Sequence, residues 1–298
     1  MYPRSFEYFV ADSVEEAINM LSSFGEEAKL LAGGQSLIPL MKLRLASPRV
    51  LIDIGRLGGL AYMRDDEACL RIGALVSHAG VLQSPPIGAR YPLIADAVSM
   101  IGDSQVKNWG TIGGALAEGD PAGDWGPVAI ALKARIRCVS PRGERIFDAE
   151  SFFVDAYTTR LDPDELISEV IFPAAAPDQC GAYVKLERRA GDFAVVSVGV
   201  QLAMDEKKIC REANIALGAA GLTPMQAHEA ATFLTGKEIR PDTIQEAARR
   251  VAAAAEPLDD IRGSQDYKRA ALQSIFKQAV DIALRRSNGE IIHAGHVY

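Results

Sequence analysis

The feature that most constrains the fold is an alternation of short apolar segments with helical patterns, punctuated by Gly and Pro. Residues 28–32 form an apolar run that stops at Gly33-Gly34, and residues 50–54 form another. Over residues 14–21, apolar side chains recur at helical spacing, and Pro39 marks a break between the two apolar runs. Short strands interspersed with helices along one chain predict an α+β fold.

The rest of the chain continues this pattern. Further strands are expected at residues 70–73, 131–139, 146–147, 165–172, 182–186, 194–204 and 215–219. Helices are expected at 77–82, at 241–255 and from about 264, and Ser13 with Glu16 forms a capping-box pattern before the first helix. Residues 174–177 read as a linker. A chain of 298 residues has room for two or three domains.

Charge and composition exclude some classes of protein. Hydrophobic residues make up 48% and charged residues 24%, the formal net charge is -7 and the isoelectric point is about 5.3. An acidic chain without Lys/Arg clusters is not expected to bind nucleic acid. No apolar stretch approaches the ~20 residues of a membrane span, and the N-terminus lacks a signal-peptide core. These features predict a soluble, cytoplasmic protein.

The cysteines indicate no metal cluster. Cys69, Cys138, Cys180 and Cys210 are far apart, and no Cys-x-x-Cys pair exists. An iron–sulfur cluster or zinc site within this chain is therefore not expected. The pattern is typical of buried thiols in a reducing compartment.

Two glycine turns are the candidate binding motifs. The first follows an apolar strand and comprises Leu31, Ala32, Gly33, Gly34, Gln35, Ser36, Leu37 and Ile38. The second comprises Thr111, Ile112, Gly113, Gly114 and Ala115, and the carboxylates of Asp120 and Asp124 follow it. Such turns can point successive N–H groups at a diphosphate, and the carboxylates could bind ribose hydroxyls. Neither turn matches the dinucleotide-binding or P-loop pattern, so by themselves they indicate only a phosphorylated cofactor.

Four longer strings carry a specific resemblance. They are residues 32–45 (AGGQSLIPLMKLRL), residues 105–124 (QVKNWGTIGG…GDPAGD), residues 185–194 (KLERRAGDFA) and residues 260–269 (DIRGS…YKR). In this order, over residues 3–285, the chain resembles the FAD-binding (medium) subunit of the carbon-monoxide dehydrogenase and xanthine dehydrogenase family of molybdenum hydroxylases.

The resemblance implies a fold. It is a two-part FAD-binding region of the vanillyl-alcohol-oxidase type, followed by a C-terminal α+β domain like that of CO dehydrogenase flavoproteins. The expected parts are subdomains at 1–57 and 58–175, a C-terminal domain at 178–287 and a tail at 288–298, which we expect to be mobile or to contact a partner.

It also implies roles for individual residues. Both turns would hold the diphosphate of FAD, Asp124 would contact the ribose, and Ile167 would lie near the adenine. Lys185 would lie at the pyrimidine edge of the flavin, Ile101 would pack on the ring, and Asp192 and Phe193 would lie close to it. No residue of this chain is expected to be catalytic, because FAD carries the redox chemistry. Two residues depart from the family: Ala115 stands where many members have Asn, and Gln35 stands where some members have His.

The implied function is electron relay. Electrons from the [2Fe-2S] clusters of a small partner subunit would pass through FAD to an external acceptor, while a large partner subunit would bind molybdopterin. The implied assembly is a dimer of heterotrimers. The substrate (carbon monoxide, a purine, an aldehyde or an N-heterocycle) and the acceptor (NAD+, a quinone, a cytochrome or oxygen) remain open. Two alternatives are a stand-alone FAD-dependent oxidoreductase acting on a small organic substrate and a flavin-free interaction protein.

Ordinary structural roles are open for several of these residues. Lys185 could be a strand-edge lysine and Asp124 could cap a helix that begins near Trp125. Arg188-Arg189 could be solvated or could contact a partner. The histidines are expected in ordinary positions, His78 and His228 at the surface or in the core and His293 and His296 in the tail.

Overall fold

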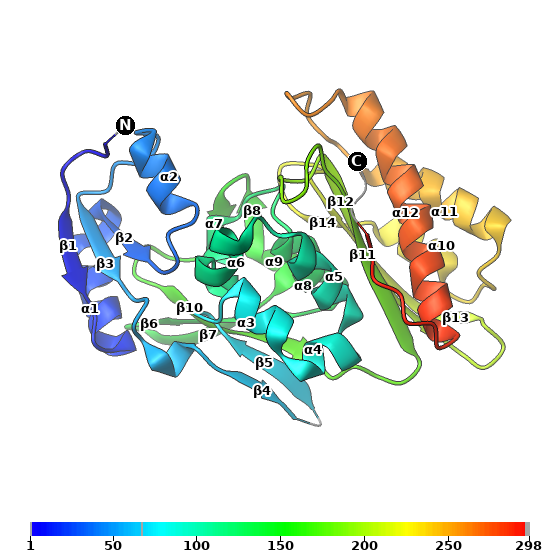
Figure 1. The fold of residues 1–298 in the computed structure, drawn as a ribbon, viewed down its shortest axis with the longest axis horizontal. Coiled ribbons are helices and arrows are strands. Elements are labelled where there is room, and N and C mark those ends of the chain that lie inside the picture. Colours follow the sequence, from blue (N-terminus) through cyan, green and yellow to red (C-terminus); the bar gives the residue numbers. More distant parts are fainter. Residues whose placement is uncertain (1, 67, 296–298) are drawn as a thin grey trace.

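The computed structural model describes residues 2–66 and 68–295. Three main sheets follow one another along the chain, each built from its own stretch of sequence (Figure 1). The N-terminal sheet lies at one end of the molecule and the long C-terminal helices lie at the other, with the second sheet and its helices between them (Figure 1). The expected α+β class is confirmed.

The first sheet is parallel, in the order β1-β3-β2. Its elements are β1 (Glu7–Val10), α1 (Val14–Phe24), η1 (Gly25–Glu27), β2 (Ala28–Leu31), α2 (Leu37–Lys42), β3 (Val50–Asp53) and η2 (Gly58–Leu60). Parallel neighbours need a crossover connection, and α2 lies in the connection between β2 and β3. Helix α1 buries Ala17, Ile18 and Leu21 in a small separate core with this sheet.

The second sheet is antiparallel, in the order β4-β5-β10-β6-β7. Its strands are β4 (Met63–Asp65), β5 (Cys69–Gly73), β6 (Arg135–Ser140), β7 (Gly143–Asp148) and β10 (Leu166–Pro173). The helices are α3 (His78–Gln83), α4 (Pro85–Arg90), α5 (Pro92–Met100), α6 (Ser104–Trp109), α7 (Ile112–Glu118), α8 (Trp125–Ala131) and α9 (Ala149–Phe152), and a ribbon joins β8 (Phe153–Asp155) to β9 (Thr158–Thr159). Six of the helices, α3 to α8, lie between β5 and β6 in the sequence, so the second glycine turn is held within a helical layer.

The third sheet is antiparallel, in the order β11-β12-β13-β14. Its elements are β11 (Gln179–Leu186), β12 (Val196–Met204), β13 (Cys210–Gly218), β14 (Met225–Gln226), α10 (His228–Leu234), α11 (Pro241–Ala254) and α12 (Gln265–Ser287). Helix α12 packs along β11 and β12; α5 contacts the same two strands, and α8 contacts β12 and β13. The first strands of this sheet therefore lie between the central helices and the C-terminal helices.

The second and third sheets share one hydrophobic core. Trp125 of α8 and Phe172 of β10 are buried against each other, with ring centroids 6.5 Å apart, and both belong to the cluster that continues into the third sheet. A buried ion pair joins the same regions: Arg286 of α12 donates two hydrogen bonds of 2.7 Å to Asp96 of α5. This core and this ion pair hold the C-terminal helices against the central part of the chain.

Most of the expected elements are present, with three corrections. The strand expected at 131–139 begins only at Arg135, because α8 runs to Ala131 and Lys133 turns the chain with a positive φ of 52°. The strand expected at 215–219 is longer and begins at Cys210. The central helices from 85 to 131, apart from the start near Trp125, were not anticipated, since their Gly and Pro residues resemble loops.

The two chain ends also differ in detail from expectation. The Glu16 amide donates to the Ser13 hydroxyl as a capping box requires, but the Glu16 carboxylate accepts from the Asp12 amide rather than from that of Ser13. Within the tail, Ala294 contacts the rest of the fold, because its amide donates a hydrogen bond to the Asp96 carboxylate. His296 lies outside the described residues.

Candidate functional site

The first glycine turn leaves β2 and exposes a run of amide groups. Gly34 has a positive φ of 71°, and the Gln35 side chain folds back to donate to the Gly33 carbonyl. Across the described residues, no protein acceptor is bonded to the amide N–H groups of Gly33, Gly34, Gln35 and Ser36. Successive amides of this kind can bind an anion such as a diphosphate.

The second glycine turn is internally satisfied. The Thr111 hydroxyl accepts a hydrogen bond from the Gly114 amide, and the Ile112 and Gly113 amides donate to carbonyls of the segment 74–76. The Ala115 amide donates to the Thr111 carbonyl. Because the Thr111 oxygen already accepts, its hydroxyl proton is available as a donor. The two turns therefore differ: the first offers main-chain amides and the second offers a hydroxyl.

The fold brings the two turns into contact. A Cβ atom placed on Gly33 would lie 1.7 Å from the Trp109 carbonyl oxygen and 3.1 Å from the Gly110 Cα atom. Only a residue without a side chain allows this approach. The sequence suggested two separate motifs, and the structure assembles them into one site.

A buried ionic cluster lies at the other end of α6 from this contact. The Lys185 ammonium is fully buried and donates to the main-chain carbonyls of Met100 (2.9 Å) and Asp192 (3.0 Å). It also lies 3.2 Å from the Asp124 carboxylate and 3.3 Å from that of Glu187. Three hydrogen bonds, to Met100, Asp192 and Asp124, and the nearby Glu187 carboxylate offset the charge of the ammonium, as a buried charge requires.

The ordinary roles considered for Lys185 and Asp124 are wrong. Strand β11 is an edge strand, but the Lys185 side chain is 0% exposed and is not solvated. Asp124 holds the N-cap position of α8, yet its side chain makes no capping bond. It accepts instead from the Tyr183 hydroxyl at 2.7 Å and from Lys185. Both residues belong to one network that links α8 to β11.

Burial and neighbouring charges perturb the titration of this region. Burial raises the pKa of Asp124, and the ammonium of Lys185 opposes that rise. Burial, followed by the charge of Asp124, raises the pKa of Tyr183 well above its usual range. The pKa of Lys107 is lowered by burial and by repulsion from Lys185. Closely coupled titratable groups of this kind are typical of functional sites.

Next to this cluster lie the other residues expected near a flavin. Ile101 is 9% exposed and follows Met100, the carbonyl partner of Lys185. Asp192 contributes its main-chain carbonyl to Lys185, and Phe193 is 48% exposed with the Arg262 guanidinium 5.8 Å above its ring. An exposed aromatic ring beside a buried ammonium offers an apolar surface to a planar group.

Asp120 and Ile167 are placed differently. The Asp120 carboxylate accepts from the Ala122 amide, and burial raises its pKa. Ile167 is 5% exposed within β10, and its neighbour Ser168 accepts from the amide of Ala74, the residue that the second turn packs against. Ile167 therefore adjoins the second turn through one intervening residue.

His78 and His228 are ordinary residues, as considered. The buried His78 ring accepts a hydrogen bond of 3.1 Å from Trp125, and burial lowers its pKa to about 4. His228 is exposed and lies 2.5 Å from Glu150. Arg188 is exposed and donates to the Ile261 carbonyl.

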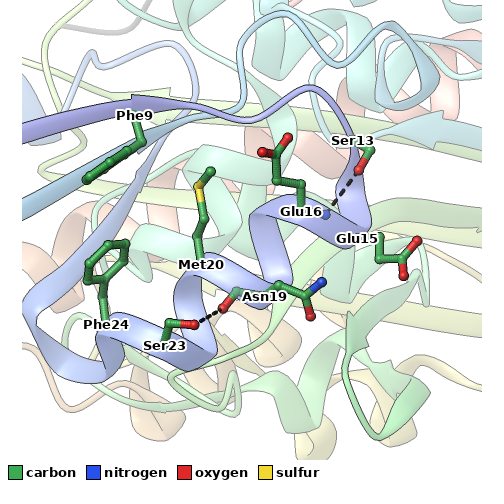
Figure 2. A pocket seen from close by; sticks show the side chains of 8 residues that line it. All are labelled: Phe9, Ser13, Glu15, Glu16, Asn19, Met20, Ser23 and Phe24. Carbon is green, nitrogen blue, oxygen red and sulfur yellow. Dashed lines mark hydrogen bonds between the residues drawn. The ribbon is translucent and has the colours of Figure 1, made fainter.

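One surface cavity lies away from this site. It is a shallow hollow of about 480 Å³ between β1 and α1, lined by Phe9, Ser13, Glu15, Glu16, Asn19, Met20, Ser23 and Phe24 (Figure 2). None of the candidate residues lines it. Across residues 2–66 and 68–295, no three His, Cys, Asp or Glu side chains gather as metal ligands, and no helix is long and apolar enough to cross a membrane.

Sequence reasoning missed Tyr183 and Glu187. A signal was present: Tyr183 and Lys185 alternate with apolar residues, so they point to one face of an otherwise apolar strand, and Glu187 continues this alternation one residue beyond the end of the strand. What could not be read from the sequence was that Asp124, 59 residues from Tyr183, would meet that face.

Comparison with known proteins identifies the family. Residues 4–175 match the family model described as FAD binding domain in molybdopterin dehydrogenase, and residues 181–283 match that of the CO dehydrogenase flavoprotein C-terminal domain. Among curated relatives, the carbon monoxide dehydrogenase medium chain of Hydrogenophaga pseudoflava is 38% identical, covering 96% of this chain and 99% of its own. The 6-hydroxypseudooxynicotine dehydrogenase complex subunit alpha of Paenarthrobacter nicotinovorans is 34% identical over 96% of this chain and 97% of its own.

Comparison with solved structures points to the same family. The carbon monoxide dehydrogenase of Hydrogenophaga pseudoflava that lacks the Mo-pyranopterin moiety superposes with a TM-score of 0.94 at 39% identity, covering 96% of this chain and 99% of that one. Quinoline 2-oxidoreductase from Pseudomonas putida 86 gives a TM-score of 0.91 at 30% identity, covering 96% and 99%. The family models, the full-length relatives and the shared fold show that this chain belongs to the FAD-binding medium subunits of the molybdenum hydroxylases related to CO dehydrogenase.

Proposed function

We propose that this chain holds FAD across the two glycine turns, with the diphosphate on the free amides of the first turn and the flavin ring near Lys185. The observation that carries the proposal is the contact of Gly33 with the segment 109–110, which directly precedes Thr111, together with the four amides of the first turn that bond to no protein acceptor among the described residues. The residues present therefore fit a diphosphate. When bound, FAD supplies the redox chemistry, and the chain supplies position and charge.

The remaining roles follow the arrangement of the elements. Helix α6 has six residues and so spans about 9 Å, separating the contact between the turns from the Lys185 cluster. The residues that we assign to the cofactor are the first turn (Leu31, Ala32, Gly33, Gly34, Gln35, Ser36, Leu37 and Ile38), the second turn (Thr111, Ile112, Gly113, Gly114 and Ala115), Asp120 and Asp124 for the ribose, Ile167 for the adenine, and Ile101, Lys185, Asp192 and Phe193 for the flavin. In this assignment 1–57 and 58–175 enclose the cofactor, and 178–287 contributes Lys185.

Lys185 is the residue with the largest electrostatic effect. Its ammonium is withdrawn from water, so its field is screened less than that of a surface lysine. A fixed cation at the pyrimidine edge favours the added negative charge of a reduced ring. The buried carboxylate of Asp124 partly offsets this charge at 3.2 Å.

The chain is proposed to work in a heteromeric enzyme, as the names of its relatives say of them. We propose a large molybdopterin-binding subunit and a small [2Fe-2S] subunit as partners, in a dimer of heterotrimers located in the cytoplasm. Large apolar side chains remain exposed at the first turn and beside it, including Ile38 (41%) and Trp109 (67%), as expected of a protein-contact surface. The four free cysteines fit a reducing compartment.

The test is the visible spectrum of the purified chain, alone and coexpressed with candidate large and small subunits. Oxidised-flavin bands that survive desalting would support the proposal, and copurification with iron–sulfur and molybdopterin chains would support the assembly. A coloured chain that never copurifies with such partners would favour the stand-alone oxidoreductase. A colourless complex would refute flavin binding.

A point substitution with a matched control sharpens this test. The Ser36 hydroxyl belongs to the first turn, so Ser36→Ala should weaken FAD binding by about 2-fold to 10-fold, the value of one hydrogen bond. Ser151→Ala removes a hydroxyl from α9, which bonds only locally to Asp148, and should leave the dissociation constant unchanged. Equal effects of the two changes would contradict the placement of the diphosphate.

A further inference from the structure

Glu187 is buried in a place where a carboxylate is costly. Its side chain is 0% exposed, and its Oε2 atom lies 3.3 Å from the Lys185 ammonium. Nothing in the family motifs assigned a role to this residue. A buried carboxylate is retained only where a cation or a set of hydrogen bonds offsets its desolvation.

The geometry around Lys185 makes Glu187 an electrostatic partner of its ammonium. The three N–H donors of the ammonium bond to two main-chain carbonyls at 2.9 and 3.0 Å and to the Asp124 carboxylate at 3.3 Å, and the Glu187 carboxylate forms an ion pair with it at 3.3 Å. The main-chain carbonyls are closest and fixed by the fold. An additional acceptor, such as a flavin carbonyl, would therefore take an N–H from a carboxylate.

Asp124 also accepts a hydrogen bond of 2.7 Å from the Tyr183 hydroxyl. Glu187 lies two residues after Lys185, one residue beyond the end of β11. The ammonium of Lys107 interacts electrostatically with Lys185, Asp124 and Glu187, so the cluster pairs two cations with two carboxylates.

We propose that Glu187 is a positioning residue that acts through Lys185: its carboxylate holds the ammonium in place and, by offsetting its charge, lowers the reduction potential of the bound flavin. This inference rests on the proposed contact of Lys185 with FAD. The sign follows from charge: a buried anion beside the cation reduces the stabilisation of negative charge on the reduced ring.

The experiment compares two isosteric substitutions in the full-length chain, together with any subunits that copurify. Glu187→Gln removes the charge beside Lys185. Glu169→Gln is the matched control, because Glu169 is also a buried carboxylate paired with cations, Arg71 and Arg137, but lies on β10 in another sheet. The readouts are the FAD dissociation constant and the two-electron midpoint potential, measured by equilibration with reference dyes.

For Glu187→Gln we expect the equilibrium between reduced and oxidised flavin to shift at least tenfold toward the reduced form, a rise of about 30 mV for a two-electron couple. Glu169→Gln should leave the potential unchanged. An unchanged potential in folded, FAD-loaded Glu187→Gln would overturn the inference, as would an equal rise in both variants. If Glu187→Gln fails to fold, Glu187→Asp takes its place, because it retracts the carboxylate from Lys185 by one methylene. Its midpoint potential should rise by less than the rise expected for Glu187→Gln, and an unchanged potential in Glu187→Asp would also overturn the inference. Failure of the wild-type chain and its complex to bind FAD would instead refute the proposed function.

Discussion

Replacing Gly33 by Ala tests whether the close approach of the two turns builds the cofactor site. The added Cβ would lie 1.7 Å from the Trp109 carbonyl oxygen. The usual carbon–oxygen contact is about 3.3 Å or more, so the turns must separate by roughly 1.6 Å. The obstructing atom belongs to the backbone and cannot rotate away.

This separation should affect binding more than folding. A displacement of about 1 Å can cost on the order of 100-fold where several groups must act together, and we expect a loss of about that size in FAD affinity. Overpacking costs about 1–3 kcal/mol, which a chain of this size can tolerate. The assay is titration of the apoprotein with FAD, followed by quenching of flavin fluorescence, with thermal unfolding measured in parallel.

The control is Gly88→Ala. Gly88 lies in α4, and an added Cβ there meets nothing within 4 Å. Ala is the better helix former, so this variant should be as stable as the wild type or slightly more stable, with unchanged FAD affinity. If Gly33→Ala binds FAD within threefold of the wild type, the contact between the turns does not build the site and the reasoning is refuted.

Three further predictions concern stability and reactivity. Arg286→Met leaves the Asp96 carboxylate buried without its bidentate partner, so the free energy of unfolding should fall by about 3–5 kcal/mol in denaturant titration. Burial lowers the pKa of His78 to about 4, below the ordinary histidine value of about 6.5; the unfolded chain therefore binds the proton first, and stability should be lost as pH falls from about 6.5 to 4, by about 3 kcal/mol in total. Burial raises the pKa of the Cys138 thiol to about 12, so it should resist alkylation at pH 8 in the native chain and react on unfolding, as mass spectrometry would show.

Each of these three predictions has a control variant or an outcome that would contradict it. Arg249→Met removes an exposed ion pair within α11 and should cost less than about 1 kcal/mol. A similar cost for Arg286→Met would show that the buried pair does not hold α12 in place. His78→Gln should flatten the pH dependence between 6.5 and 4; an unchanged slope would assign that dependence to other groups. Rapid native alkylation of Cys138 would contradict its burial.

The sequence alone determined the elements with strong periodicity. The strands near residues 28, 50 and 166 and the helices from 241 and from 264 could be read directly, because their apolar patterns and their start signals agree. The motifs at 32–45, 105–124 and 185–194 sufficed to indicate the family, which the comparisons show. The helices between 85 and 131 could not be read, since their Gly and Pro residues also suit loops and only tertiary packing favours the helix.

Only the tertiary structure decided how the candidate residues combine. Gly33 meets Trp109 although the two residues belong to different parts of the chain, a contact that no local pattern encodes. The same is true of Lys185, which the sequence presents as one lysine in an apolar strand. Its burial against Asp124, Glu187 and the Met100 carbonyl depends on long-range packing of α5 on β11 and of α8 on β12 and β13. The local sequence sets which ionisable groups are present. The fold decides which of them are buried away from water and therefore have to be paired with an opposite charge.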